Sequence, residues 1–91
     1  MKTLKGDRYI YVRMAYDLLK NCGEKRITVG RDNGMVGGQN YWRAFELITH
    51  KDDLYIVETK TTAHMVSYTR AYKVHEYTSN VSFEQPTEWE H

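Results

Sequence analysis

The stretch from His64 to Tyr77 constrains the fold of this chain more than any other. It contains no Gly or Pro, and its Tyr, Thr and Val residues are typical of a strand. Read as a helix, its apolar residues scatter around the whole wheel. Read at a period of two, they share one face: Val66, Tyr68, Tyr72 and Val74. The stretch therefore predicts a long strand of a β-sheet.

Residues 7–22 predict a helix. Asp7 suits the N-cap, and Gly23 suits the left-handed residue that ends a helix. The polar side chains gather on one narrow arc, so we expect the helix to be buried over most of its surface, Leu18 included. We expect Cys22 to be a buried structural thiol. As the single Cys of the chain, it excludes an internal disulfide.

Shorter strands are predicted at residues 26–30 and 54–59, and Asn33-Gly34 is a hairpin signal. The segment from Tyr41 to Thr49 fits either a helix or a strand. We favour a strand, because it matches residues 54–59 in length across a polar turn. The predicted architecture is one α+β domain over residues 1–78, with the N-terminal helix packed on an antiparallel sheet of about four strands. Residues 79–91 form an acidic tail, in which we expect Trp89 to pack back on the body.

Length, composition and charge limit the classes of protein to which this chain can belong. The chain has 91 residues and lacks an apolar run long enough to cross a bilayer, which predicts a small cytoplasmic domain without membrane contact. The net charge of +1 hides a split, because residues 1–31 carry +5 and the remainder carries −4. The basic third either attracts phosphate or an acidic protein surface, or is neutralised by the rest of the fold.

The motifs argue against a cofactor, a metal or an assembled catalytic site. The four histidines have no ligand spacing, and the glycines at 30–38 do not match a phosphate-binding loop. The strongest enzyme reading is a metal-independent, toxin-like ribonuclease built on His64, Arg70, Lys73 and His75. Strand parity places the two histidines on opposite faces unless a bulge shifts the register. We therefore favour a role without enzymatic activity, and the ribonuclease stays open as an alternative.

We expect instead a small non-catalytic binding protein that engages a protein partner, such as a phage or mobile-element inhibitor of a host system. Tyr68, Arg70 and Tyr72 are the residues proposed to contact the partner, because Arg and Tyr carry much interface energy. Arg70 sits in an apolar strand face, so it needs an internal carboxylate or a bound partner. Nucleic-acid binding by the basic third and a homodimer stay open as alternatives. The residues for nucleic-acid binding would be Arg8, Arg13, Arg26 and Arg31.

Overall fold

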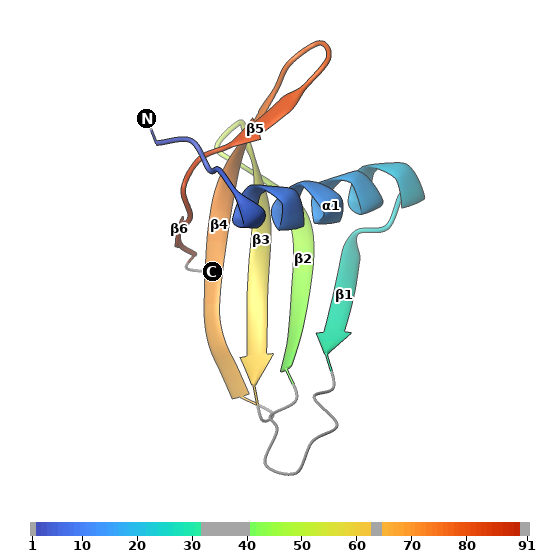
Figure 1. Ribbon diagram of the computed structural model, residues 1–91, viewed down its shortest axis with the longest axis vertical. Helices are drawn as coiled ribbons and strands as arrows, with labels where there is room; N and C mark the ends of the chain where they lie inside the picture. The colour runs from blue at the N-terminus through green and yellow to red at the C-terminus, as the bar shows by residue number, and fades with distance from the viewer. Residues whose placement is uncertain (1, 32–40, 63–64, 90–91) are drawn as a thin grey trace.

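A computed structural model describes residues 2–31, 41–62 and 65–89 of the chain. Within these ranges the chain forms one helix and six strands (Figure 1). They are α1 (Asp7–Cys22), β1 (Arg26–Arg31), β2 (Tyr41–His50), β3 (Asp53–Thr62), β4 (Met65–Glu76), β5 (Val81–Phe83) and β6 (Thr87–Glu88). The predicted α+β class, with an N-terminal helix on an antiparallel sheet, is confirmed. The sheet has more strands than the four or so expected.

The strands follow the order β1-β2-β3-β4-β5, β6 also pairs with β4, and every pairing is antiparallel. β2 and β3 form a hairpin whose turn residues, Lys51 and Asp52, both have positive φ, as a tight turn of matching twist requires. This confirms the strand reading of Tyr41 to Thr49. The turn predicted at Asn33-Gly34 lies outside the described residues.

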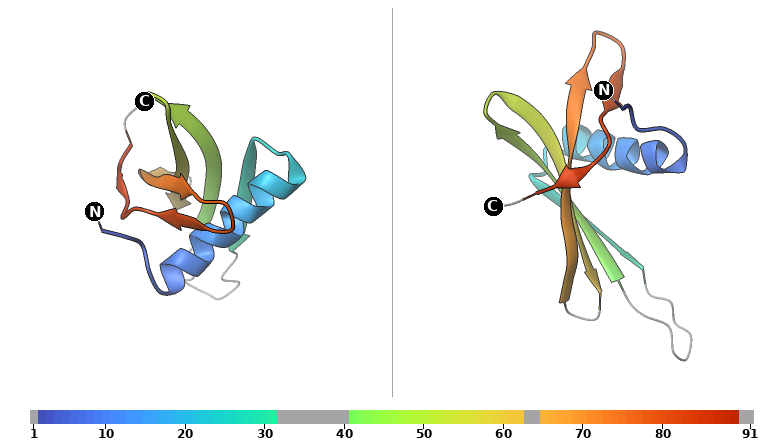
Figure 2. Two further views of the ribbon diagram at one scale, coloured as in Figure 1. Left: turned by 90° about the horizontal axis from the view of Figure 1, so that it is seen from above. Right: turned by 90° about the vertical axis from the view of Figure 1, so that its left-hand side faces the viewer.

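α1 crosses the sheet near one end of the strands and leaves the other half of that face uncovered (Figures 1 and 2). Its buried residues are Val12, Ala15, Tyr16 and Leu19. They pack over Phe45, Ile56 and Tyr72 from the three central strands and over Phe83. This hydrophobic cluster therefore lies at the end of the sheet that the helix covers, while Val57 and Ala71 are buried on the opposite face.

The ends of α1 depend on two glycines. Gly23 ends the helix at φ 66°, as predicted. The N-cap is Gly6, at φ 75° and ψ −152°, and Asp7 is the first helical residue, so the predicted cap was wrong by one position. Asp7 still places a carboxylate in the first turn, where it interacts favourably with the helix dipole.

The helix is less buried than its sequence predicts. Leu18 retains 46% of its exposure, and Ile10 and Met14 on neighbouring turns are also exposed. Cys22 is exposed rather than buried, because the last turn of α1 extends past β1 and the edge of the sheet (Figure 1). α1 is the one helix among the described residues, and it is too short and too polar to span a membrane.

The C-terminal segment is part of the sheet. Val81 and Phe83 belong to the core, and the backbone N–H of Leu4 donates to the carbonyl of Phe83 over 2.8 Å. Further along, the ring of Trp89 packs against His50 and Tyr55 on the face of the sheet opposite to α1, with ring centroids 5.5 and 5.4 Å away. The prediction that Trp89 packs back on the body is confirmed.

A register shift interrupts the pairing of β3 with β4 between Lys60 and Thr61. Tyr68 is the register partner of Lys60, whereas Val66 is the partner of Thr61. Since Lys60 and Thr61 are consecutive, Val66 lies on the face opposite to Tyr68. The prediction that these two residues share a face was therefore wrong, because the bulge reverses the alternation.

Candidate functional site

Glu58 lies on the face of the sheet against which α1 packs. It is at the boundary between the half that α1 covers and the half that α1 leaves uncovered. Its side chain is fully buried, and it is the one buried charged residue in the described ranges. Oε1 accepts a hydrogen bond of 2.7 Å from the hydroxyl of Tyr72, and Oε2 accepts one of 3.2 Å from the hydroxyl of Tyr68. A carboxylate buried to this extent needs such partners to offset its lost hydration.

Three arginines surround the same carboxylate. Arg8 of α1 places Nη1 3.5 Å from Oε1, and Arg70 of β4 places Nε 3.7 Å from Oε1. Arg43 of β2 places Nε 3.2 Å from Oε2, although this nitrogen is not aligned for a hydrogen bond. The internal carboxylate that Arg70 was predicted to need is therefore Glu58. The cluster links the helix and β3 with both neighbours of that strand.

The cluster keeps its cations charged and its buried phenol neutral. Burial acts to lower the pKa of Arg8, but the surrounding Tyr72, Tyr68 and Glu58 outweigh burial and raise it. Burial likewise opposes the charge of Arg43, whose pKa is nevertheless raised by its contacts with Tyr11 and Tyr68. The pKa of Tyr72 is raised by burial first and then by its hydrogen bond to Glu58. Positive charge therefore persists on this face at any pH compatible with folding.

Cations and tyrosine rings alternate across the uncovered half of this face. The guanidinium of Arg43 lies 5.2 Å from the ring centroids of both Tyr11 and Tyr41. The ammonium of Lys60 lies 5.2 Å from Tyr41 and 5.9 Å from Tyr68, and the guanidinium of Arg70 stacks on Tyr68 at 3.7 Å. Cation–π contacts of this kind fix the cations over the rings. We call this set, together with Arg8, the arginine–tyrosine face: Arg8, Tyr11, Tyr41, Arg43, Lys60, Tyr68 and Arg70.

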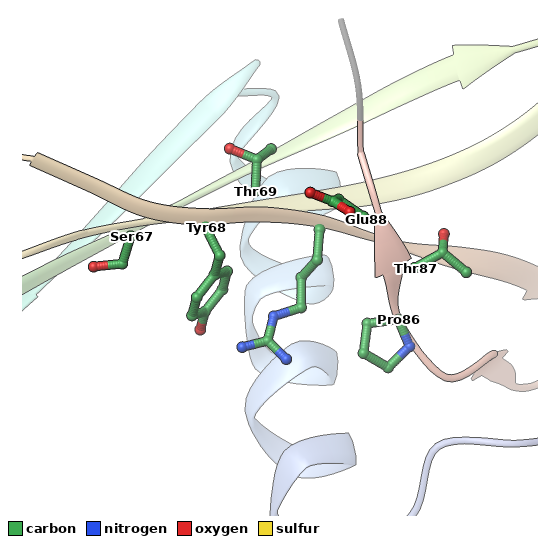
Figure 3. Close-up of a pocket in the computed structure, with 7 residues that line it drawn as sticks. Ser67, Tyr68, Thr69, Pro86, Thr87 and Glu88 are labelled. Atoms are coloured by element: carbon green, nitrogen blue, oxygen red, sulfur yellow. The ribbon is translucent and has the colours of Figure 1, made fainter.

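Two hollows flank this face. One, of about 350 Å³, lies between β4 and the C-terminal segment (Figure 3). Figure 3 shows Ser67 and Tyr68 on one side of it and Pro86 on the other. The second, of about 220 Å³, is lined by Asp7, Arg8, Tyr11 and Arg43. Both hollows are open to solvent and include charged side chains in their lining, so the face can admit groups from a partner molecule.

The three residues of β4 that were predicted to contact a partner differ in how deeply they are buried. Tyr68 and Arg70 belong to the arginine–tyrosine face and are partly exposed. Tyr72 has no exposed surface, so its ring belongs to the core and only its hydroxyl reaches Glu58. Of the three residues, Tyr68 and Arg70 are therefore the ones placed to touch a partner.

The arginines of the N-terminal third are separated by the fold. Arg8 joins the arginine–tyrosine face, whereas Arg13 pairs with Asp17 over 3.1 Å on another side of α1. Arg26 pairs with Glu46 over 3.1 Å on the face of the sheet opposite to the helix. The side chain of Arg31 lies outside the described residues. The three described arginines therefore do not form one patch.

Sequence reasoning did not single out five members of the site, although it pointed to Arg70. The missed residues are Tyr11, Tyr41, Arg43, Glu58 and Lys60. A signal for two of them exists in β3, where Ile56, Glu58 and Lys60 alternate at a period of two. This pattern places a carboxylate and an ammonium on the apolar face of a strand.

The histidines do not contribute to this face where they are described. His75 makes a 2.6 Å contact with Glu84, and His50 packs against Trp89. His64 and His91 lie outside the described residues, so the His64–His75 arrangement stays a prediction. The described ranges contain no group of His, Cys, Asp and Glu side chains that could hold a metal ion.

Comparisons with known proteins add no relative. A scan of protein-family models, a search of curated proteins and a search of solved structures each found no match to this chain.

Proposed function

We propose that this protein is a small non-catalytic binding protein that engages a protein partner through the arginine–tyrosine face. The observation that carries the proposal is the alternation of cations and tyrosine rings on the half of the sheet that α1 leaves uncovered. Arg and Tyr are the side chains that most often dominate interface energies. Here their conformations are already held by Glu58 and by mutual stacking, so little side-chain entropy is lost on binding.

The charge of the face favours an acidic surface on the partner. The face carries four cations, three of which share one buried carboxylate, while Asp7 and Glu88 line the two flanking hollows. Such complementarity speeds association and excludes basic competitors. A domain of this size that covers an acidic functional surface would inhibit the partner. We propose this inhibitory role for the chain, as the product of a phage or mobile element.

Nucleic acid is the second candidate. The specific observation in its favour is that tyrosine rings and cations alternate, as they do where bases stack and phosphates are paired. The apolar side chains that border the face, among them Met14 and Val29, favour protein instead.

Capture experiments test the proposal with two matched lysine variants. Lys60→Glu reverses a charge on the arginine–tyrosine face, whereas Lys73→Glu does so on the opposite face of the next strand. We expect the native chain and Lys73→Glu to retain the same protein from nuclease-treated lysate of the source organism. We expect Lys60→Glu to weaken retention about tenfold or more. Equal retention by both variants would refute the proposed face, and material lost on nuclease treatment would favour nucleic acid.

A further inference from the structure

We propose that the segment bound by the arginine–tyrosine face is an acidic stretch of polypeptide with one aliphatic anchor side chain, which enters an apolar groove beside Arg43. The inference rests on the proposed function and specifies the chemistry of the partner. The groove lies between α1 and the first two strands and has a volume of about 80 Å³. It is lined by Tyr11, Met14, Ala15, Leu18, Val29 and Phe45.

The groove and the cationic face are continuous. Val29 and Arg43 are register partners on β1 and β2, so their Cβ atoms lie about 5 Å apart on one face of the sheet. Tyr11 lines the groove on one side and, on the other, the hollow that contains Arg8 and Arg43. One ligand segment therefore reaches both sites within one or two residues.

The groove suits an aliphatic side chain better than a base. The residues that line it are apolar apart from the Tyr11 hydroxyl, which suits an aliphatic group, whereas a nucleobase would leave its polar edge without hydrogen-bond partners there. Three of its apolar residues remain substantially exposed in the free chain: Met14 at 60%, Leu18 at 46% and Val29 at 40%. An anchor that covers them removes apolar surface from water, which is the main driving force of association.

The charge of the arginine–tyrosine face determines which residues of the partner can lie next to the anchor side chain. Arg70 lies between Glu58 and Glu88, its register partners on β3 and β6, so much of its charge is balanced. Arg43 shares the single charge of Glu58 with Arg8 and Arg70, and Lys60 contacts tyrosine rings but no carboxylate of the described residues, so both keep positive charge to offer a partner. Carboxylates next to the anchor would meet these two cations. The occupant is therefore acidic as well as apolar.

Four fluorescein-labelled peptides of one length test this chemistry against the full chain by fluorescence polarisation. The first combines Leu and Glu. The other three replace Leu with Ser, Glu with Gln, or Glu with Lys. We expect the Leu–Glu peptide to bind tightest. Replacement of Leu should weaken binding about tenfold or more, because a buried Leu contributes at least that factor. Replacement of Glu should weaken binding by a similar factor, because the cations of the face lose their charged partners.

Two exposed residues of α1 provide matched variants. Leu18→Ser changes the groove, whereas Ile10→Ser removes an apolar side chain of similar exposure that does not line it. We expect Leu18→Ser to abolish the preference for Leu over Ser in the peptide while the preference for Glu over Gln persists. We expect Ile10→Ser to keep both preferences. Circular dichroism confirms that both variants are folded.

Several outcomes overturn the inference. Binding that depends on Glu but not on Leu would remove the anchor and leave the proposed face intact. Equal effects of Ile10→Ser and Leu18→Ser, or no peptide binding at all, would also reject it, while the lysate capture judges the proposed function separately. Tighter binding of single-stranded oligothymidylate than of any peptide would assign the site to nucleic acid. Sedimentation that shows self-association, lost in Leu18→Ser, would assign the groove to a second copy of the chain.

Discussion

The hydroxyl of Tyr72 donates a 2.7 Å hydrogen bond to Oε1 of Glu58, so the largest fully buried side chain of the described core ends on its buried carboxylate. The ring of Tyr72 packs with the apolar residues beneath α1, while Glu58 also holds three arginines. This hydrogen bond therefore connects the apolar core to the residues of the arginine–tyrosine face. A change at Glu58 acts on stability and on the candidate binding surface together.

Replacing this carboxylate provides the first prediction. We expect Glu58→Gln to lower the free energy of unfolding by about 3 kcal/mol, because the guanidinium groups lose their counter-charge in a largely desolvated place. At a typical m value of about 1.5 kcal/mol/M, the urea midpoint falls by about 2 M. Glu46→Gln is the control, since it breaks the exposed pair with Arg26 and should cost about 0.5 kcal/mol or less. Equal losses in the two variants would contradict the central role of Glu58.

The two helix-end glycines should respond differently to substitution. Both have positive φ and open space around an added Cβ, so backbone strain alone decides the outcome. Gly23 is in the left-handed region, where Ala costs about 1 kcal/mol and Asn costs less. Gly6, at ψ −152°, is in a region that is essentially restricted to Gly, so Gly6→Ala should cost about 2 kcal/mol. Thermal unfolding ranks the three variants, and a neutral Gly6→Ala would refute this reading of the cap.

Alkaline pH should destabilise the fold through its buried phenols. Burial and a hydrogen bond to Glu76 raise the pKa of Tyr16 to about 12, and burial also raises the pKa of Tyr72. Because the unfolded chain ionises these groups near pH 10, their contribution is complete below that pH and is lost as the pH rises toward 12. Absorbance titration should show at least two of the eight tyrosines ionising late in the native state. In urea all eight should titrate near pH 10, and Tyr16→Phe should remove one late group.

The C-terminal segment should be required for folding. Phe83 has no exposed surface and contacts the rings of Tyr9 and Tyr16, so Phe83→Ala should cost about 3–5 kcal/mol. Ser82→Ala, on the same short strand and outside the core, should cost less than about 1 kcal/mol. A fragment of residues 1–78 lacks Val81 as well as Phe83, so we expect its circular dichroism to be that of an unfolded chain. A cooperative melt of this fragment would show that the segment is dispensable.

Local patterns were sufficient to predict the individual elements. The helical period and the C-terminal signal of Gly23 predicted α1, although the N-cap lies one residue earlier than predicted, and matched arm lengths predicted the β2–β3 hairpin. They did not predict exposure at Leu18 and Cys22, because the width of the sheet beneath the helix is set by long-range pairing. For the same reason, a bulge in β4 reversed the side of Val66 without a local signal.

The candidate site was only half predictable. Arg70 was identified because a guanidinium on an apolar strand face needs a partner. Glu58 was missed because a single acid in a strand usually faces solvent. Its burial depends on the register that places it opposite Arg70 and on arginines from two other elements, Arg8 and Arg43. Such convergence of distant segments is not encoded at any fixed spacing.

The contact between Leu4 and Phe83 determines when this chain can acquire its structure. The ribosome completes α1 long before it adds Phe83, the side chain that fills the space between Tyr9 and Tyr16. Until then the apolar side of the helix has no complete surface to cover it. Pairing of segments so distant in sequence is slow, because a large loop must close before any contact repays its entropy. The domain should therefore complete its fold only after Phe83 has been added and has left the ribosome, and until then its exposed helix is the segment that a chaperone would meet first.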